Sequence, residues 1–417
     1  MKIERKIYRI IGLWMVFLSP FTFHLSPLSA QNMTSSPYSR YAYGDMNENV
    51  PTAYRAMGGV GIGMRNNRAI CPAQPASYTS CDSLTFMLDI AASASWSHYK
   101  DVSGVKNKAN GNLEYLTIQV PLWKRWIAAS VGLLPYSSVG YDIAISDSTA
   151  GGGYHYTTTY TGNGNISQVY GGLSFNICNW VAVGANVYYM WGDLNRMRSL
   201  AFTESNLNTT IQSEILSVSN VRFRAGAQVF HTWGKHTVNV GAIFESKMKL
   251  NSQLIAIETQ TDDTIPIYKG YWQLPMVWGV GAGYNWDNRL TLGFDFERQC
   301  MADALYNGAE GRFSGLQDRN RFAFGMEYRH NPMSRKYVER MMWRAGVSVQ
   351  DEYLVTIGAK RISATIGIGF PLPTIGTVIN MTVEYTHRGN TKGLEDNGLR
   401  FTIGAAIAEN WFFKRKL

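Results

Sequence analysis

An alternation of apolar and polar side chains over residues 84–100 constrains the fold of this chain more than any other feature of the sequence. One parity is apolar from Phe86 to Trp96, and the positions between are mostly polar. This period of two is expected of a β-strand with one face against an apolar medium. The alternation covers about thirteen residues, whereas a globular strand has about half that length and a tilted membrane-crossing strand needs about nine to eleven. The stretch therefore predicts a membrane-crossing strand.

The same alternation recurs to the C-terminal end, as in residues 221–229, 290–296 and 379–385. Short turns alternate with longer polar segments, which we expect to be loops at about 193–214 and 251–271. We count about fourteen strands, and an even number places both ends of a barrel on the periplasmic side. Aromatic side chains gather at the strand ends, as rings at a lipid-water boundary do. A large soluble β-sandwich is the alternative, but these strands are too long for it.

The first 30 residues have the organisation of a secretory signal peptide. A basic start precedes an apolar stretch over residues 10–23, and Leu28-Ser29-Ala30 offers a cleavage site before Gln31. A membrane-anchor helix is the alternative, but the stretch is short and no stop-transfer pattern follows. Since the mean hydropathy of −0.16 is compatible with a barrel, we expect a protein exported to the outer membrane of a Gram-negative cell. A net charge of +9 favours contact with membrane lipid and lipopolysaccharide and is too diffuse to indicate nucleic acid.

The segment over residues 31–83 lacks any regular period and is rich in glycine, so we expect a plug inside a barrel formed by residues 84–417. The predicted fold class is all-β, a transmembrane antiparallel β-barrel of about 14 strands with an N-terminal plug. Glycine permits close backbone approach and positive φ. A nucleotide-binding loop is excluded because the spacing is not G-x-G-x-x-G and no helix can follow. The predicted plug residues are Arg55, Gly58, Gly59, Gly61, Gly63, Asn66 and Asn67.

The spacing of the cysteines is compatible with one disulfide. Cys71 and Cys81 lie in one loop and can form a disulfide in an oxidising compartment. The sequence has no C-x-x-C pair and no zinc-type spacing, so we predict neither a metal nor a cofactor. No histidine lies in a motif that names a nucleophile, so we do not expect an enzyme.

Charged residues share the inward parity of several predicted strands. They could line a route for an anionic head group, or pair across strands to tie wall and plug together. The second role is the more common one. The predicted lumen charges are Arg222, Arg224, Glu245, Lys247, Asp295 and Glu297.

The run from Arg55 to Gly61, followed by Cys71-Pro72-Ala73, resembles the glycine-rich and Asn-Pro-Ala segments of the long-chain fatty-acid transporter (FadL-like) family of outer-membrane barrels. Cys71 stands where that family usually has asparagine. The resemblance implies a passive channel for hydrophobic molecules, blocked by the plug and opened towards the membrane at a kinked strand. Because proline removes a ladder donor, we assign the kink and lateral opening to a short stretch of the third strand. Its residues are Pro135, Ser137, Ser138 and Gly140.

Two functions are compatible with these features. The first is an outer-membrane channel for passive uptake of a hydrophobic ligand such as a long-chain fatty acid, gated by the plug and the kink. The second is a FadL-like barrel that does not transport and acts as a subunit of an outer-membrane assembly or secretion complex. The resemblance favours the first, and the second predicts a tightly occluded lumen.

Overall fold

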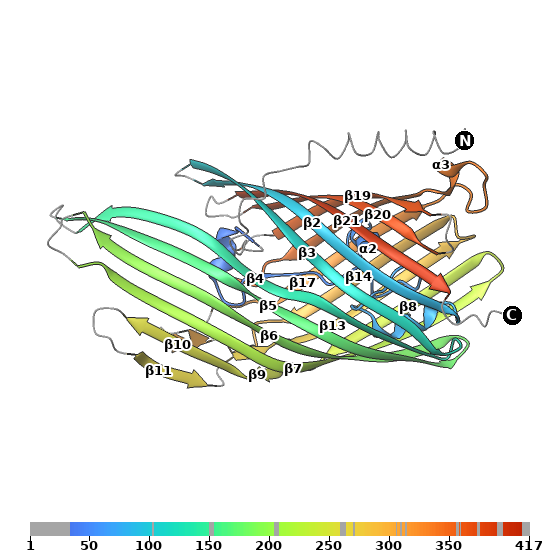
Figure 1. Ribbon diagram of the computed structural model, residues 1–417, viewed down its shortest axis with the longest axis horizontal. Helices are drawn as coiled ribbons and strands as arrows, with labels where there is room; N and C mark the ends of the chain where they lie inside the picture. The colour runs from blue at the N-terminus through green and yellow to red at the C-terminus, as the bar shows by residue number, and fades with distance from the viewer. Residues whose placement is uncertain are drawn as a thin grey trace, which may run out of the picture. The chain divides into compact units, whose positions relative to one another are not determined.

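The computed structural model describes residues 34–101, 104–149, 154–203, 208–258, 264–269, 272–305, 307–308, 311–312, 315–355, 358, 360–372, 376–389 and 395–410. Within them, 14 antiparallel strands close into a barrel, in which the first strand pairs with the last (Figure 1). The predicted fold class is therefore confirmed. The predicted signal peptide, residues 1–30, lies outside the described residues.

The barrel strands follow one another in chain order around the ring, each paired with its neighbours. They are β2 (Thr85–Asp101), β3 (Gly104–Trp123), β4 (Ile127–Ser148), β5 (His155–Cys178), β6 (Val181–Phe202), β7 (Thr210–Trp233), β8 (His236–Glu245), β13 (Met276–Trp286), β14 (Leu290–Cys300), β17 (Arg319–Tyr328), β18 (Met342–Asp351), β19 (Lys360–Pro371), β20 (Val378–Gly389) and β21 (Glu395–Asn410).

Shorter elements lie in the plug and in the connections. The plug contains η2 (Pro37–Arg40), β1 (Asp45–Met46), α2 (Thr52–Arg55) and η3 (Pro75–Ser80). The connections contain β9 (Met248–Leu250), β10 (Ser252–Glu258), β11 (Thr264–Lys269), β12 (Trp272–Leu274), β15 (Asn307–Gly308), β16 (Gly311–Arg312) and α3 (Tyr337–Arg340). Among the helices of the described residues, none has the length and apolar character needed to span a membrane.

The alternating pattern corresponds to two faces of the wall. On β14, Phe294 is 47% exposed on the outside, whereas its neighbour Asp295 is 2% exposed and points into the lumen. Phe322, Val347 and Ile366 continue the exposed apolar face on β17, β18 and β19. An outer apolar surface around a polar interior is the arrangement of a membrane-spanning barrel.

The expected polar loop at 193–214 is mostly strand. β6 continues to Phe202 and β7 begins at Thr210. β7 has 24 residues, about twice the length that a bilayer requires. The outer part of such a strand no longer contacts lipid, so its sequence lacks the apolar alternation on which the prediction depended.

The plug lies inside the ring of strands and contacts walls on different sides of it. The helix α2 contacts β19, β20 and β21, and η3 contacts β4 to β7. Gly58 and Gly63 allow this close fit. Gly58 has a φ of 71°, and a Cβ there would lie 2.6 Å from the carbonyl oxygen of Val347. A Cβ on Gly63 would lie 2.5 Å from the backbone of Ala282, so any larger residue would push the plug off the wall.

Within the described residues, the wall has an incomplete seam between β3 and β4. These strands pair only from Trp123↔Ile127 to Leu116↔Leu133. Farther towards the long-loop end, the free edge of β4 pairs with the plug strand β1, with Asp45 opposite Ser138 and Met46 opposite Ser137. A segment of the plug therefore lies where the wall strands separate.

Candidate functional site

The plug and the wall that holds it form the candidate site, and Asp295 fixes the glycine-rich turn. Its buried carboxylate accepts hydrogen bonds from the backbone N–H groups of Gly61 at 2.5 Å, Ile62 at 2.8 Å and Gly63 at 3.1 Å. Three donors converge on one carboxylate because glycines permit the tight turn. Asp295 thus satisfies plug backbone that would otherwise be buried without partners.

Two glutamines hold the other side of the same turn. The side-chain amide of Gln228 donates to the carbonyl oxygens of Ile62 at 3.1 Å and Met64 at 2.9 Å. Gln74, itself in the plug, donates to Ile62 at 3.2 Å and to the wall carbonyl of Ala227 at 3.3 Å. The turn over residues 61–64 is therefore bonded through both its donors and its acceptors.

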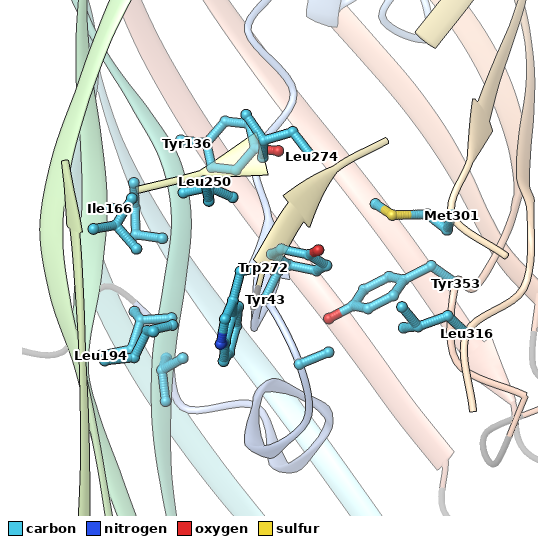
Figure 2. Close-up of a cluster of buried hydrophobic side chains, with 14 of the residues drawn as sticks. Tyr43, Tyr136, Ile166, Leu194, Leu250, Trp272, Leu274, Met301, Leu316 and Tyr353 are labelled. Carbon is cyan, nitrogen blue, oxygen red and sulfur yellow. The ribbon is translucent and has the colours of Figure 1, made fainter. Parts of the chain in front are cut away.

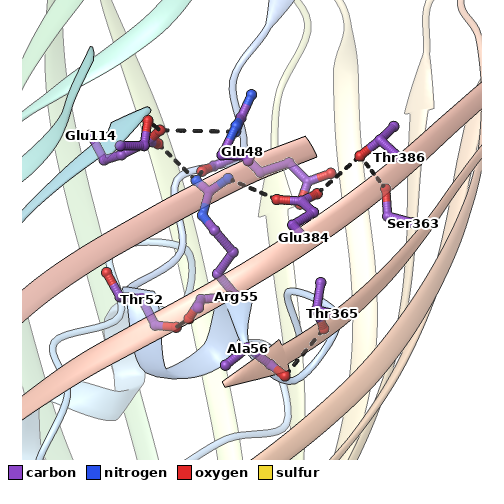
Figure 3. A network of polar contacts seen from close by, with 12 residues as sticks. Glu48, Thr52, Arg55, Ala56, Glu114, Ser363, Thr365, Glu384 and Thr386 are labelled. Atoms are coloured by element: carbon purple, nitrogen blue, oxygen red, sulfur yellow. Dashed lines mark hydrogen bonds and ion pairs between the residues drawn. The ribbon is translucent and has the colours of Figure 1, made fainter. Parts of the chain in front are cut away.

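Arg55, at the end of α2, joins the plug to two strands (Figure 3). Its guanidinium lies 2.9 Å from a carboxylate oxygen of Glu114 on β3 and 3.5 Å from one of Glu384 on β20. Burial alone would lower the pKa of Arg55, but Glu114, Glu384 and Glu48 together raise it above the ordinary value. The nearby plug residue Glu48 pairs at 3.1 Å with Arg321 on β17. These groups are mutually neutralised, which indicates a structural role.

The predicted lumen charges fall into separate groups. Arg222 on β7 lies 2.5 Å from Glu245 on β8, and Arg224 pairs with the same carboxylate. Arg224 also donates to the plug carbonyl of Ala73 at 3.1 Å. Glu297 is half-buried and accepts a hydrogen bond from Gln299 at 2.8 Å.

Lys247 does not belong with the lumen charges. β8 ends at Glu245, so the strand parity that would turn Lys247 inward stops before it. Its exposed ammonium donates to the carbonyl oxygen of Asp303 instead.

The stretch predicted as the kink contains a register shift between Pro135 and Ser137 in the pairing of β4 with β5. Plug groups occupy its open edge. Ser39 Oγ lies 3.1 Å from both the N–H and the carbonyl oxygen of Gly140, and Asn47 donates its N–H to the carbonyl of Tyr136 at 2.9 Å. With the β1 pairing at Ser137 and Ser138, the edge exposed by the irregularity is hydrogen-bonded to the plug.

Apolar side chains fill the long-loop half of the lumen (Figure 2). Tyr43 from the plug packs edge-on against Trp272, with ring centroids 5.8 Å apart. Tyr353 donates its hydroxyl to the carbonyl oxygen of Gly44 at 2.7 Å. Leu194 and Leu216, both fully buried, complete the wall side of this cluster. The chain's own residues therefore occupy the main apolar region of the interior.

Two small cavities lie inside the lumen of the described structure, and a large one lies at the short-turn end. One of about 80 Å³ lies beside Arg222 and Glu245, and another of about 100 Å³ lies beside Arg388. The third has about 1270 Å³ and is bounded by the plug and the short turns. We call this third cavity the short-turn cup. Two predicted plug residues, Asn66 and Asn67, line it, and Asn67 donates to Asp82 at 3.1 Å.

The disulfide considered for Cys71 and Cys81 is absent, since both are free, buried thiols. They pack into different apolar clusters, with Cys71 beside Val50 and Cys81 beside Tyr78. Cys71 donates its thiol to the carbonyl oxygen of Gly61 at 3.8 Å. Burial raises the pKa of Cys71 to about 12 and raises that of Cys81 as well. Within the described residues, no group of His, Cys, Asp and Glu side chains is arranged to hold a metal ion.

This chain matches a known protein family. A family model described as BamG matches residues 13–417. The chain belongs to the BamG family. No curated protein matches it.

Solved structures show that this BamG-family chain shares the FadL-type fold. A Pseudomonas aeruginosa FadL homologue has 14% identity and a TM-score of 0.60, with 89% of this chain and 100% of that chain covered. The P. putida toluene transporter TodX has 14% identity and a TM-score of 0.59, with 88% and 99% covered. The CymD monoaromatic hydrocarbon channel has 13% identity and a TM-score of 0.57, with 88% and 100% covered. At such low identities the likeness concerns the fold.

Sequence reasoning missed several groups that hold the plug of this BamG-family barrel. Gln228 shares the inward parity of Arg222 and Arg224, so parity could have found it. Glu114 has the outward parity of Leu116, and a register shift in the pairing of β2 with β3 turns it inward, so parity could not have found it. Gln74 lies in the irregular plug, where no period exists, and only the structure reveals its contacts.

Proposed function

We propose that this chain is a closed outer-membrane barrel that serves as a subunit or docking platform of an envelope protein complex. The observation that carries the proposal is that one segment, residues 34–82, occupies both the lumen and the open edge of β4. A channel needs at least one of these routes to be open.

The nature of the plug contacts supports a permanent closure. Backbone groups of residues 61–64 are bonded to Asp295 and Gln228, and Arg55 is buried between carboxylates of two strands. Breaking a buried ion pair by moving one partner away costs about 3 to 5 kcal/mol. Releasing the plug would break several such contacts together, which is unfavourable for a gate that must open often.

Apolar side chains of the described residues also occupy interior space that a hydrophobic ligand would need. Tyr43, Trp272 and Leu194 pack in the apolar region, and two cavities found in the lumen, of about 80 and 100 Å³, lie beside charged groups. Pockets for small ligands usually have about 300 to 1,000 Å³. The BamG family match is compatible with membership of an envelope complex.

A channel for passive uptake of hydrophobic small molecules, such as long-chain fatty acids, is the second candidate. The fold shared with the toluene transporter TodX supports it, as does the irregular β4 at Pro135. In this candidate the plug and the kinked strand would move to open the lateral seam.

Purification of the tagged chain from its native envelope in mild detergent tests the first proposal. We expect other envelope proteins to co-purify in fixed ratio and the lumen to hold no lipid-like molecule by mass spectrometry. A barrel that purifies alone with fatty acid bound would instead support the channel.

A further inference from the structure

The short-turn cup carries more positive charge than its acidic residues neutralise. Its lining has acidic side chains at Asp82, Asp287 and Glu327. The cationic side chains are more numerous: Arg65, Arg68, Lys124, Arg125, Arg289 and Arg329. A concave surface of one sign attracts ligands of the opposite sign.

Not all of these cations are available to a ligand. Arg65 is engaged by the plug, because its guanidinium donates to the carbonyl oxygen of Ala76 at 3.0 Å and lies over the ring of Phe230. Arg125 pairs with Asp82 at 3.3 Å, and Arg289 pairs with Asp287 at 3.5 Å. The unbalanced charge therefore lies on Lys124, in a turn at the rim, and on Arg68 and Arg329.

Glu327 attracts both of those arginines, and another residue already holds it. Arg344 donates to Glu327 at 2.7 Å. Arg329 lies 3.8 Å from the other oxygen of Glu327, which is beyond hydrogen-bonding distance. Arg344, Arg329 and Arg68 thus share Glu327. Asp82 also attracts Arg68, but Asp82 is paired with Arg125.

Arg329 and Arg68 have unused donors. Arg329 is 95% buried, since its exposed fraction is 5%, and its Nε has no hydrogen-bond partner in the described part of the chain. Within the same residues the guanidinium of Arg68 makes no hydrogen bond or ion pair. Burial and then the neighbouring Arg68 lower the pKa of Arg329 to about 10, so the two positive charges oppose each other. A buried charge without a partner destabilises the folded protein unless a ligand supplies the missing partner.

We propose that Arg68 and Arg329 form a carboxylate-binding site at the floor of the short-turn cup, which receives an acidic segment of a periplasmic protein. The inference rests on the proposed docking function and identifies these two arginines as the place where the partner binds. Guanidinium groups bind carboxylates through paired hydrogen bonds. Short turns of outer-membrane barrels face the periplasm, so the site is open to proteins of that compartment.

The size and lining of the cup favour a protein segment over a free small anion. Its volume of about 1270 Å³ exceeds what one phosphate fills, and asparagine amides such as those of Asn179 and Asn288 line it. Such amides can donate to and accept from peptide groups. The exposed Met333, which also lines the cup, offers an apolar contact.

Binding of a fluorescein-labelled hexaglutamate peptide to the purified barrel in detergent tests the proposal. We expect saturable binding that Arg68→Gln weakens by about tenfold or more. Because the Arg68 guanidinium has no hydrogen-bond partner in the described part of the chain and its charge opposes that of Arg329, the melting temperature of Arg68→Gln should be unchanged or higher than that of the wild type. The control is Arg335→Gln, which should bind normally, because Arg335 is exposed and lies outside the cup, in the β17–β18 connection that also carries Arg329.

Three outcomes would overturn the inference. They are equal peptide binding by Arg68→Gln and the wild type, a fall in the melting temperature of Arg68→Gln with normal binding, and binding of inorganic phosphate without binding of the peptide.

Co-purification distinguishes a wrong binding site from a wrong docking function. If partners co-purify equally with the wild type and Arg68→Gln, the site is wrong and docking stands, whereas a wild type without partners contradicts docking itself.

Discussion

Single residues hold the plug through ion pairs and hydrogen bonds. The sequence alone does not show which inward-facing residues make these contacts. Asp295 and Arg222 look equivalent in the strand pattern, yet Asp295 binds plug backbone and Arg222 pairs with a wall glutamate. Strand parity predicts that both point inward, but their partners depend on how the plug is placed. The sequence thus identified lumen residues and could not assign their contacts.

Replacement of Asp295 tests the importance of the glycine turn. Asp295→Asn keeps the shape but removes the charge that accepts three N–H groups, so we expect a loss of about 1 to 3 kcal/mol in the free energy of unfolding. Denaturant unfolding followed by tryptophan fluorescence measures it. Asp303→Asn, at an exposed position, is the control, and equal stability of the two variants would refute the anchoring role.

Thiol reactivity tests the burial of the plug cysteines. With a pKa of about 12, the Cys71 thiol has a thiolate fraction of about one in ten thousand at pH 8, and this fraction rises with pH. We expect iodoacetamide to modify Cys71 and Cys81 only after denaturation, as measured by mass spectrometry. Rapid modification in the folded barrel, or a linked Cys71–Cys81 peptide, would contradict the structure.

At the scale of elements, the strands were predictable and the seam was not. The alternation of apolar and polar residues predicted the number of strands, because contact with lipid on one face imposes this alternation on every strand. The pairing of β1 with β4 left no such signal, since two residues form it and backbone groups supply its hydrogen bonds. Pro135 predicted an irregular β4, and the structure adds which segment pairs with its edge.

A bulky residue at Gly44 should detach β1 from β4. Gly44 has a φ of 77°, and a Cβ there would lie 2.5 Å from the carbonyl oxygen of Ser138. We expect Gly44→Val to accelerate hydrogen exchange of β4 amides at residues 137–140 without loss of the barrel. Gly171→Val on β5, where a Cβ meets nothing within 4 Å, should leave exchange unchanged. Equal protection in both variants would show that β1 does not cover the seam.

At the scale of the whole molecule, we propose that this FadL-type barrel of the BamG family is closed to hydrophobic solutes. Its lumen, its apolar interior and the edge of β4 are all occupied by residues 34–82 or by their partners. On the proposed function, the fold that forms a channel in TodX forms a docking platform in this chain.

Uptake into liposomes tests this claim most directly. The wild-type barrel, reconstituted at a known density, is supplied with a labelled long-chain fatty acid or with toluene, and TodX serves as the positive control. We predict that the wild-type barrel admits both compounds no faster than liposomes without protein. Uptake at a rate comparable to that of TodX would contradict the closed-barrel account and establish the channel.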